Sequence, residues 1–138
     1  MSAIVSKSGE NLSIGKEERI EILSEFLKKT GLKLKKVLIL PPDLTRYNSA
    51  AGQITEILFE LLKGVEVDIM PALGTHAPMT EKEIRHMFGE KIPLARFKVH
   101  DWRKSLIHLG DVPSSLISEW SEGKLDYSVK MEVNKILF

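Results

Sequence analysis

The spacing of apolar residues along the chain predicts four helices. In two of them, apolar side chains recur every three or four residues, as Ile54, Ile57 and Leu61 do. The third opens with a capping box that begins at Thr80, and the fourth opens with a proline in its first turn. The predicted helices occupy residues 16–29, 54–62, 80–88 and 113–120.

Short apolar or alternating runs predict strands between these helices. Residues 37–40 form a continuous apolar run, which is typical of a strand covered on both faces, as in a parallel sheet. The other predicted strands occupy residues 65–69, 97–99 and 127–133. This alternation is typical of the α/β class, so we expect a Rossmann-like layered domain with a mostly parallel sheet flanked by helices. The length suits a single α/β domain over residues 1–138, with residues 1–15 as an irregular lead-in.

Composition excludes several classes of function. The net charge of +1 provides no large electrostatic field, so neither nucleic acid nor an anionic membrane surface is expected as a partner. The chain has no cysteine, which excludes disulfides, thiolate metal sites and cysteine nucleophiles. No apolar run approaches the roughly 20 residues that span a bilayer, and the amino terminus lacks a signal-like segment. We therefore predict a cytoplasmic protein.

Polar residues that could bind a ligand or take part in catalysis follow three of the predicted strands. These segments are Asp43-Leu44-Thr45-Arg46, Gly74-Thr75-His76 and His100-Asp101. In open α/β sheets, ligands bind outside the carboxyl ends of the strands. If the strands run parallel, these segments open on the same edge of the sheet. Topology alone therefore predicts that an aspartate, an arginine and a histidine converge there.

The first segment suits the binding of an anion. The planar guanidinium of Arg46 matches a carboxylate through two parallel hydrogen bonds. Asp43, three residues earlier, is placed to fix that guanidinium or to accept a hydroxyl proton. Thr45 is expected to tie the turn together. We therefore include all three residues in a candidate substrate-binding set.

The second segment suits acid–base chemistry. His76 precedes the predicted amino terminus of a helix, whose dipole disfavours the imidazolium form and favours a neutral general base. Gly74 allows a close backbone approach to a ligand or a positive φ angle, and with Thr75 it completes the candidate substrate-binding set. A functional role is less strongly indicated for the other histidines, and both His86 and His108 are expected to face solvent.

Residue chemistry alone leaves plainer interpretations open. The segment around Arg46 is also typical of an ordinary turn, and a histidine in a loop is more often a surface residue than a catalytic one. One alternative is a non-catalytic module that binds a carboxylate or phosphate through Arg46 and a helix amino terminus. Another is a metal-dependent hydrolase with His76, His100 and Asp101 as ligands, although no tight spacing such as His-x-x-x-His occurs.

Two motifs in order add a resemblance to a known family. The segments Pro41-Pro42-Asp43-Leu44-Thr45-Arg46 and Ala72-Leu73-Gly74-Thr75-His76-Ala77-Pro78-Met79-Thr80-Glu81 resemble the paired motifs of lactate racemase and its homologues. Weaker landmarks of the same amino-terminal domain are similar to His100-Asp101, Leu109-Gly110 and Glu132-Val133-Asn134-Lys135. The resemblance covers nearly all of the chain from Val37 to Lys135.

The resemblance implies a racemase or epimerase that acts on a 2-hydroxy acid or sugar acid. Members of the family use a nickel-pincer nucleotide, to which the α-hydrogen passes as hydride while a histidine takes the hydroxyl proton. By the motif, His76 would be one of two such catalytic histidines. Arg46 would bind the substrate carboxylate, and Asp43 would support the polar network around it.

Two departures from the family pattern change the expectation. Many relatives carry a basic residue after the motif histidine, where this chain has Ala77. This removes a possible anchor for lactate, so a larger sugar acid is at least as good a candidate substrate. Family enzymes also continue with a second catalytic histidine, a lysine that tethers the pincer, a nickel-binding histidine and a second domain. The chain would then be the amino-terminal domain, or a truncated part, of a two-domain enzyme.

Further expectations follow for the chain by itself. We predict that it has no racemase activity, binds no cofactor and has no metal site of its own. The missing carboxyl-terminal domain is its expected partner. Exposure of the face that would meet this domain is expected to make the chain self-associate.

Overall fold

The computed structural model describes residues 4–138, which form two compact units. The first unit contains the described residues up to Leu73 together with Ala77–Val99, and the second contains Gly74–His76 and His100–Phe138. Residues 4–15 contain no helix or strand, as expected for the lead-in; the first three residues of that prediction lie outside the described residues. None of the described helices combines the length and apolar character needed to cross a membrane.

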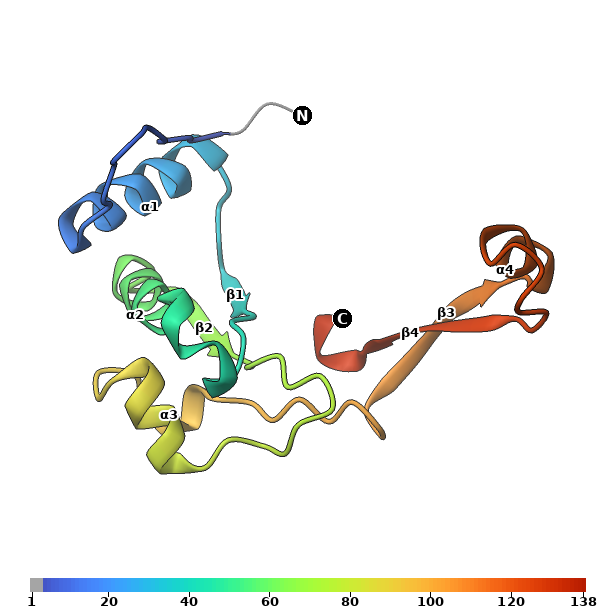
Figure 1. Ribbon diagram of the computed structural model, residues 1–138. Coiled ribbons are helices and arrows are strands. Elements are labelled where there is room, and N and C mark those ends of the chain that lie inside the picture. Colours follow the sequence, from blue (N-terminus) through green and yellow to red (C-terminus); the bar gives the residue numbers. More distant parts are fainter. Residues whose placement is uncertain (1–3) are drawn as a thin grey trace. The chain divides into compact units, whose positions relative to one another are not determined.

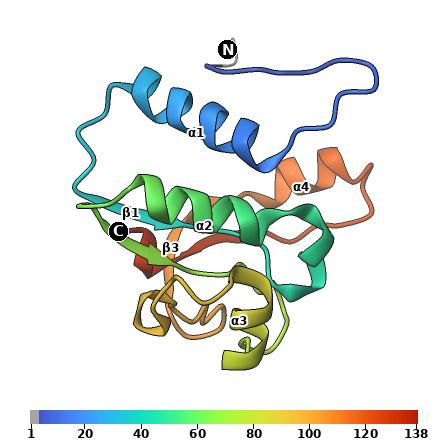
Figure 2. The ribbon, with the colours of Figure 1, turned by 90° about the vertical axis from the view of Figure 1, so that its left-hand side faces the viewer.

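The first unit contains a pair of parallel strands and three α-helices. Strand β1 (Lys36–Ile39) pairs with β2 (Glu66–Ile69), and Val37 lies opposite Val67 in the register. The helices are α1 (Lys16–Thr30), α2 (Ala51–Leu61) and α3 (Glu81–Phe88). Both views of the ribbon show α2 lying between α1 and α3 (Figures 1 and 2). The helices predicted over residues 16–29, 54–62 and 80–88 are therefore confirmed, although α2 begins three residues earlier than its apolar pattern.

The helix ends follow from the residues that the sequence places there. Gly31 ends α1 with a left-handed φ of 61°, and its N–H donates to the Lys28 carbonyl oxygen. Thr80 begins α3 as a capping box: its hydroxyl accepts from the Glu83 N–H at 3.3 Å, and its own N–H donates to the Glu83 carboxylate at 2.7 Å. These groups satisfy backbone donors and acceptors that a helix end otherwise leaves exposed.

The core of the first unit lies where α2, β2 and α3 meet. Ile69 of β2 and Phe88 of α3 are almost fully buried, at 0% and 1% exposure, and the Phe88 ring packs against Phe97 with ring centroids 5.1 Å apart. The buried members of the core cluster are Leu62, Val67, Ile69, Met87, Phe88 and Ile92. Three of the four residues of β2 are buried, because this strand lies between β1 and the Phe97 bridge.

The parallel sheet is narrower than the sequence analysis expected. Residues 97–99 were predicted as a third strand, but only Phe97 pairs, in an isolated parallel bridge to Ile69. The Lys98 N–H donates to the Ile69 carbonyl oxygen at 2.7 Å, and no ladder of successive bonds continues from there in the described residues. A short 3₁₀ turn, η2 (Leu94–Arg96), immediately precedes this point and leaves little extended backbone for pairing. The fold is therefore mixed α/β with a parallel sheet of two strands, and a Rossmann-like layered domain is not confirmed.

The second unit is built on an antiparallel pair of strands. Strand β3 (Leu106–Val112) pairs with β4 (Val129–Asn134), and the short helix α4 (Ser114–Trp120) lies in the connection between them, as Figure 1 shows. The helix predicted at residues 113–120 corresponds to α4, and the last strand predicted at residues 127–133 corresponds to β4. Strand β3 was not predicted. A register shift between His108 and Gly110 interrupts the alternation of β3, so the strand gives no regular pattern.

Candidate functional site

The turn after β1 is organised by the Asp43 carboxylate. Asp43 is buried, at 5% exposure, and it is the N-cap of the 3₁₀ helix η1 (Leu44–Ser49). Its Oδ1 accepts hydrogen bonds from the Thr45 N–H at 3.1 Å and from the Thr45 hydroxyl at 2.5 Å. Thr45 therefore ties the turn together, as the sequence predicted. The charge of Asp43 is held in place by local donors.

Arg46 lies on the same turn with its side chain exposed to solvent. Its N–H donates to the Asp43 carbonyl oxygen at 3.0 Å, which closes the turn. Its backbone angles, φ −110° and ψ 28°, depart from helical values inside η1. The turn therefore exposes a guanidinium, a group that can form two parallel hydrogen bonds with a carboxylate.

The second candidate segment, Gly74–His76, belongs to the second unit. Gly74 has a φ of 58° in the left-handed region, which confirms the positive φ that the sequence analysis considered for this glycine. Thr75 and His76 are both exposed. His76 therefore lies at the surface of its unit.

His100 and Asp101 lie half-buried in the same unit as His76. The Asp101 carboxylate accepts from the Arg103 N–H at 3.2 Å and from the Lys104 N–H at 3.0 Å. Its carbonyl oxygen accepts from the Asn134 side chain at 3.1 Å. Asp101 therefore serves the local turn and its connection to β4.

The strand ends that lead to the two candidate segments lie side by side. Pro42 forms a parallel bridge with Ala72, and the Ala72 N–H donates to the Pro41 carbonyl oxygen at 2.8 Å. Asp43 and Leu73 follow these bridge partners directly in the sequence. The two chain segments that lead to the candidate residues therefore run parallel as far as Pro42 and Ala72. That Arg46 and His76 lie close to each other stays a prediction.

The described residues offer no set of side chains for a metal ion. No group of three or more His, Cys, Asp or Glu side chains within residues 4–138 is placed to hold one. The hydrolase alternative, with His76, His100 and Asp101 as ligands, therefore gains no support from the structure.

The amino terminus of α3 lies within the electrostatic influence of Asp43. Hydrogen bonds from the Thr80 N–H and hydroxyl lower the pKa of the Glu83 carboxyl below its ordinary value, while the charge of Asp43 acts in the opposite direction. Glu83 is therefore a charged acceptor that already occupies the first turn of α3. An incoming anion would meet this negative charge at the helix end.

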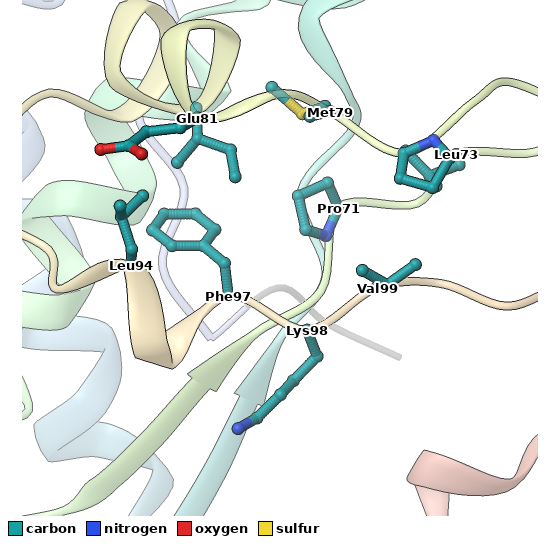
Figure 3. Close-up of a pocket in the computed structure, with 10 residues that line it drawn as sticks. Pro71, Leu73, Met79, Glu81, Leu94, Phe97, Lys98 and Val99 are labelled. Atoms are coloured by element: carbon teal, nitrogen blue, oxygen red, sulfur yellow. The ribbon is translucent and has the colours of Figure 1, made fainter.

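An apolar pocket of about 240 Å³ lies near the carboxyl ends of β2 and the Phe97 bridge (Figure 3). Pro71, Met79 and Phe97 are among the side chains around it, and Lys98 extends away from them in the close-up. The Lys98 ammonium is 3.4 Å from the Asp68 carboxylate, which accounts for its direction. Because its lining is mostly apolar, this pocket does not suit the carboxylate of a small acid.

Sequence reasoning missed an aromatic contact beside the Arg46 turn. Tyr47 stacks on His86 of α3, with ring centroids 4.7 Å apart and planes 10° from parallel. His86 is exposed, as predicted, but its ring is engaged in this contact. The sequence carries no signal for this contact, because Tyr47 and His86 lie on different elements that no periodicity relates.

Two solved structures resemble the chain. A crystal structure of a Thermotoga maritima protein, solved by a structural genomics consortium, has a TM-score of 0.81 and 28% identity over 96% of this chain. The lactate racemase apoprotein from Thermoanaerobacterium thermosaccharolyticum has a TM-score of 0.63 and 24% identity over 89% of this chain, a likeness of fold. This chain spans 32% of the first protein and 29% of the second, about a third of each.

Sequence comparisons give one further match. Among curated protein sequences, none matches the chain. The family model of the lactate racemase N-terminal domain matches residues 10–121, which include the Asp43–Arg46 turn and the Gly74–His76 segment. The chain therefore belongs to the lactate racemase N-terminal domain family.

Proposed function

We propose that the complete protein inverts the stereochemistry at the second carbon of a 2-hydroxy acid or sugar acid, and that this chain supplies substrate-binding and acid–base residues. The observation that carries the proposal is the turn after β1, where a buried Asp43 anchors the exposed Arg46 beside the strand end that leads to His76. Membership of the lactate racemase family supports the same reaction class.

Arg46 binds the substrate carboxylate in this proposal. A guanidinium and a carboxylate form two parallel charge-assisted hydrogen bonds, which fix both the position and the plane of the acid. Asp43 holds the turn through Thr45, so the arginine backbone does not need to be ordered when the substrate binds. Gly74 and Thr75 complete the binding set, with Gly74 giving the loop its left-handed turn.

His76 exchanges the proton of the substrate hydroxyl. When the C2–H bond breaks, its electron pair leaves with the hydrogen as hydride, the hydroxyl proton passes to His76, and the substrate becomes a 2-keto acid. Return of hydride to the opposite face, with the proton delivered back to the oxygen, gives the inverted acid. Hydride acceptance is the chemistry that a nickel-pincer nucleotide supplies in this family.

The cofactor is assigned to parts of the protein outside this chain. The described residues provide no group of three metal-binding side chains, so they do not fit a nickel site. We propose that a carboxyl-terminal domain carries the cofactor and that the isolated chain is inactive. Ala77, in place of the basic residue of many relatives, makes a larger sugar acid at least as good a candidate substrate as lactate.

Stereochemical inversion by the complete gene product tests the proposal. The protein is supplied with the pincer cofactor and assayed by chiral chromatography on a panel of 2-hydroxy and sugar acids. Loss of a general acid–base group typically lowers the rate by about 10²–10⁴-fold, and we expect His76→Ala to fall in that range. His108→Ala is the matched control, because His108 lies on β3 with its Nε2 3.2 Å from Asp111.

The binding-module alternative predicts a different outcome. It requires Arg46 and a helix amino terminus to hold a carboxylate or phosphate without chemistry. At α3, however, Thr80 and the charged Glu83 already occupy the first turn, which disfavours an anion there. Binding of an acid that survives His76→Ala, with no inversion of any acid on the panel, would support the module and overturn the racemase proposal.

A further inference from the structure

The turn that carries Arg46 is fixed at both of its ends. At the start, Asp43 caps η1 through the Thr45 N–H and hydroxyl. At the end, Ala50 adopts a left-handed φ of 60°, and its carbonyl oxygen accepts from the Ile54 N–H at 3.0 Å as α2 begins. Between these points, the backbone of Arg46 departs from helical angles. Arg46 is therefore the place where η1 is least regular.

The Tyr47–His86 stack restrains η1 immediately after this irregular residue. The rings are 4.7 Å apart and nearly parallel, and they come from different elements, η1 and α3. Stacked aromatic pairs of this kind add stabilisation beyond the area that they bury. The stack therefore holds Tyr47, and with it the peptide unit that follows Arg46, against a second element.

Helix α3 is itself closely packed at the position of His86. The next residue, Met87, is 5% exposed, and its carbonyl oxygen lies 1.9 Å from where a side-chain carbon on Gly52 would be. Such an approach of α2 and α3 is possible only at a glycine. His86 therefore projects from a helix whose distance from α2 is fixed, and the Tyr47 ring rests on it.

We infer that the Tyr47–His86 stack is a positioning device for Arg46. It neither contacts the substrate nor takes part in the chemistry; it limits the directions in which the exposed guanidinium can point, so less conformational freedom is lost when an acid binds. The inference rests on the proposed role of Arg46 as the carboxylate anchor. Beyond that role, we infer that Arg46 binds the carboxylate effectively because Tyr47 and His86, on different elements, restrain the turn that carries it.

Mobility and binding measured on the same chain test the inference. Nitrogen-15 NMR relaxation gives the order of the Arg46 side-chain Nε–H and of the backbone amide at position 47. Titration with sodium L-lactate and sodium D-gluconate gives binding through the amide shifts of η1. Tyr47→Ala is expected to increase the motion of Arg46 and to weaken binding about three- to ten-fold, the cost of ordering one such side chain. Tyr47→Phe and His86→Phe keep two stacked rings and are expected to match the wild-type chain in both measurements.

A double-mutant cycle separates positioning from general loss of structure. In the Arg46→Ala chain, Tyr47→Ala is expected to weaken binding no further, because the side chain that the stack positions is gone. Thermal unfolding of each variant verifies that it is folded. Unchanged Arg46 motion in Tyr47→Ala, or equal weakening of binding with and without Arg46, would overturn the inference.

Failure of the proposed function gives a different result. If Arg46→Ala binds both acids as the wild-type chain does, Arg46 is not their anchor, and the proposed role of Arg46 fails. The relaxation measurement still decides whether the stack restrains the turn, because it requires no ligand.

Discussion

Asp43 combines two tasks that substitution can separate. Its Oδ1 accepts two hydrogen bonds from Thr45, a task that an asparagine oxygen can also perform. We propose that its negative charge also supports Arg46. We expect Asp43→Ala to lower the free energy of unfolding by about 1 kcal/mol, as loss of an N-cap does. Asp43→Asn should keep most of that stability. Urea denaturation of both variants measures the difference.

Activity of the complete protein then reports on the charge. If the carboxylate supports the polar network around the substrate, Asp43→Asn lowers the rate of inversion while leaving the unfolding midpoint nearly unchanged. An asparagine variant with wild-type activity would show that Asp43 only caps the turn.

Gly52 sets the distance between α2 and α3. A side-chain carbon there would lie 1.9 Å from the Met87 carbonyl oxygen, far inside any allowed contact, so Gly52→Ala must push the helices apart. Overpacking of this kind typically costs about 1–3 kcal/mol, and we expect at least that loss in thermal or urea unfolding. Gly9→Ala is the control, because its added carbon meets only Leu12 at an ordinary 3.8 Å. Equal stability of the two variants would contradict the close approach.

At the scale of elements, the capping box of α3 predicts a dependence of stability on pH. Hydrogen bonds from Thr80 lower the pKa of Glu83 below 4.5, so the folded chain binds this proton less readily than the unfolded chain. The stabilisation is therefore complete above pH 4.5 and is lost as the pH falls through the lowered pKa of the folded state. We expect Glu83→Gln to reduce the acid-dependent loss of stability relative to the wild-type chain, in urea titrations at neutral and acidic pH.

A neutralisation in the same helical turn provides the control. Glu81→Gln removes one negative charge near the same helix end but leaves the hydrogen bonds between Thr80 and Glu83 in place. It should retain the acid-dependent loss attributed to Glu83. Identical pH profiles for the two variants would show that the effect comes from net charge rather than from the capping box.

The helices of the first unit could be predicted from the sequence because local residues determine their ends. Gly31 and Thr80 each occupy the helix end that their chemistry favours. The strands depended more on partners distant in the sequence. Residues 97–99 have strand character, yet only Phe97 pairs, because pairing was decided by Ile69 and by the preceding 3₁₀ turn. Strand β3 was missed because its register shift breaks the period of two.

The candidate site was predictable in part. The turn chemistry of Asp43 and Thr45 follows from residue type, and the parallel course of the two chain segments as far as Pro42 and Ala72 follows from the parallel pairing of β1 and β2. The Tyr47–His86 stack was not predictable, because it joins residues from η1 and α3 that no periodicity relates.

For the whole molecule, we propose that the expected self-association occurs through one face of the antiparallel ribbon formed by β3 and β4. The register of β3 and β4 places Ile107, Val133 and Met131 on one face of the ribbon, whereas His108 and Glu132 lie on the other. Met131 is 45% exposed. A two-stranded ribbon is marginally stable by itself and gains stability when its apolar face is covered.

We expect the apparent mass of the chain to rise with concentration in light scattering. Met131→Lys should suppress this rise by placing a charge on the apolar face. Glu132→Gln changes the net charge by the same amount on the opposite face and should leave the rise intact. A monomer at all concentrations, or equal effects of the two substitutions, would remove the proposal that this face self-associates.

We propose that this chain contributes acid–base and carboxylate-binding residues to a hydroxy-acid racemase or epimerase. The most direct measurement is stereochemical inversion by the complete gene product, supplied with the pincer cofactor, in parallel with its His76→Ala and His108→Ala variants. We expect inversion of at least one 2-hydroxy or sugar acid, lost in His76→Ala and retained in His108→Ala. Inversion that survives His76→Ala, or no inversion of any acid tested, would contradict it.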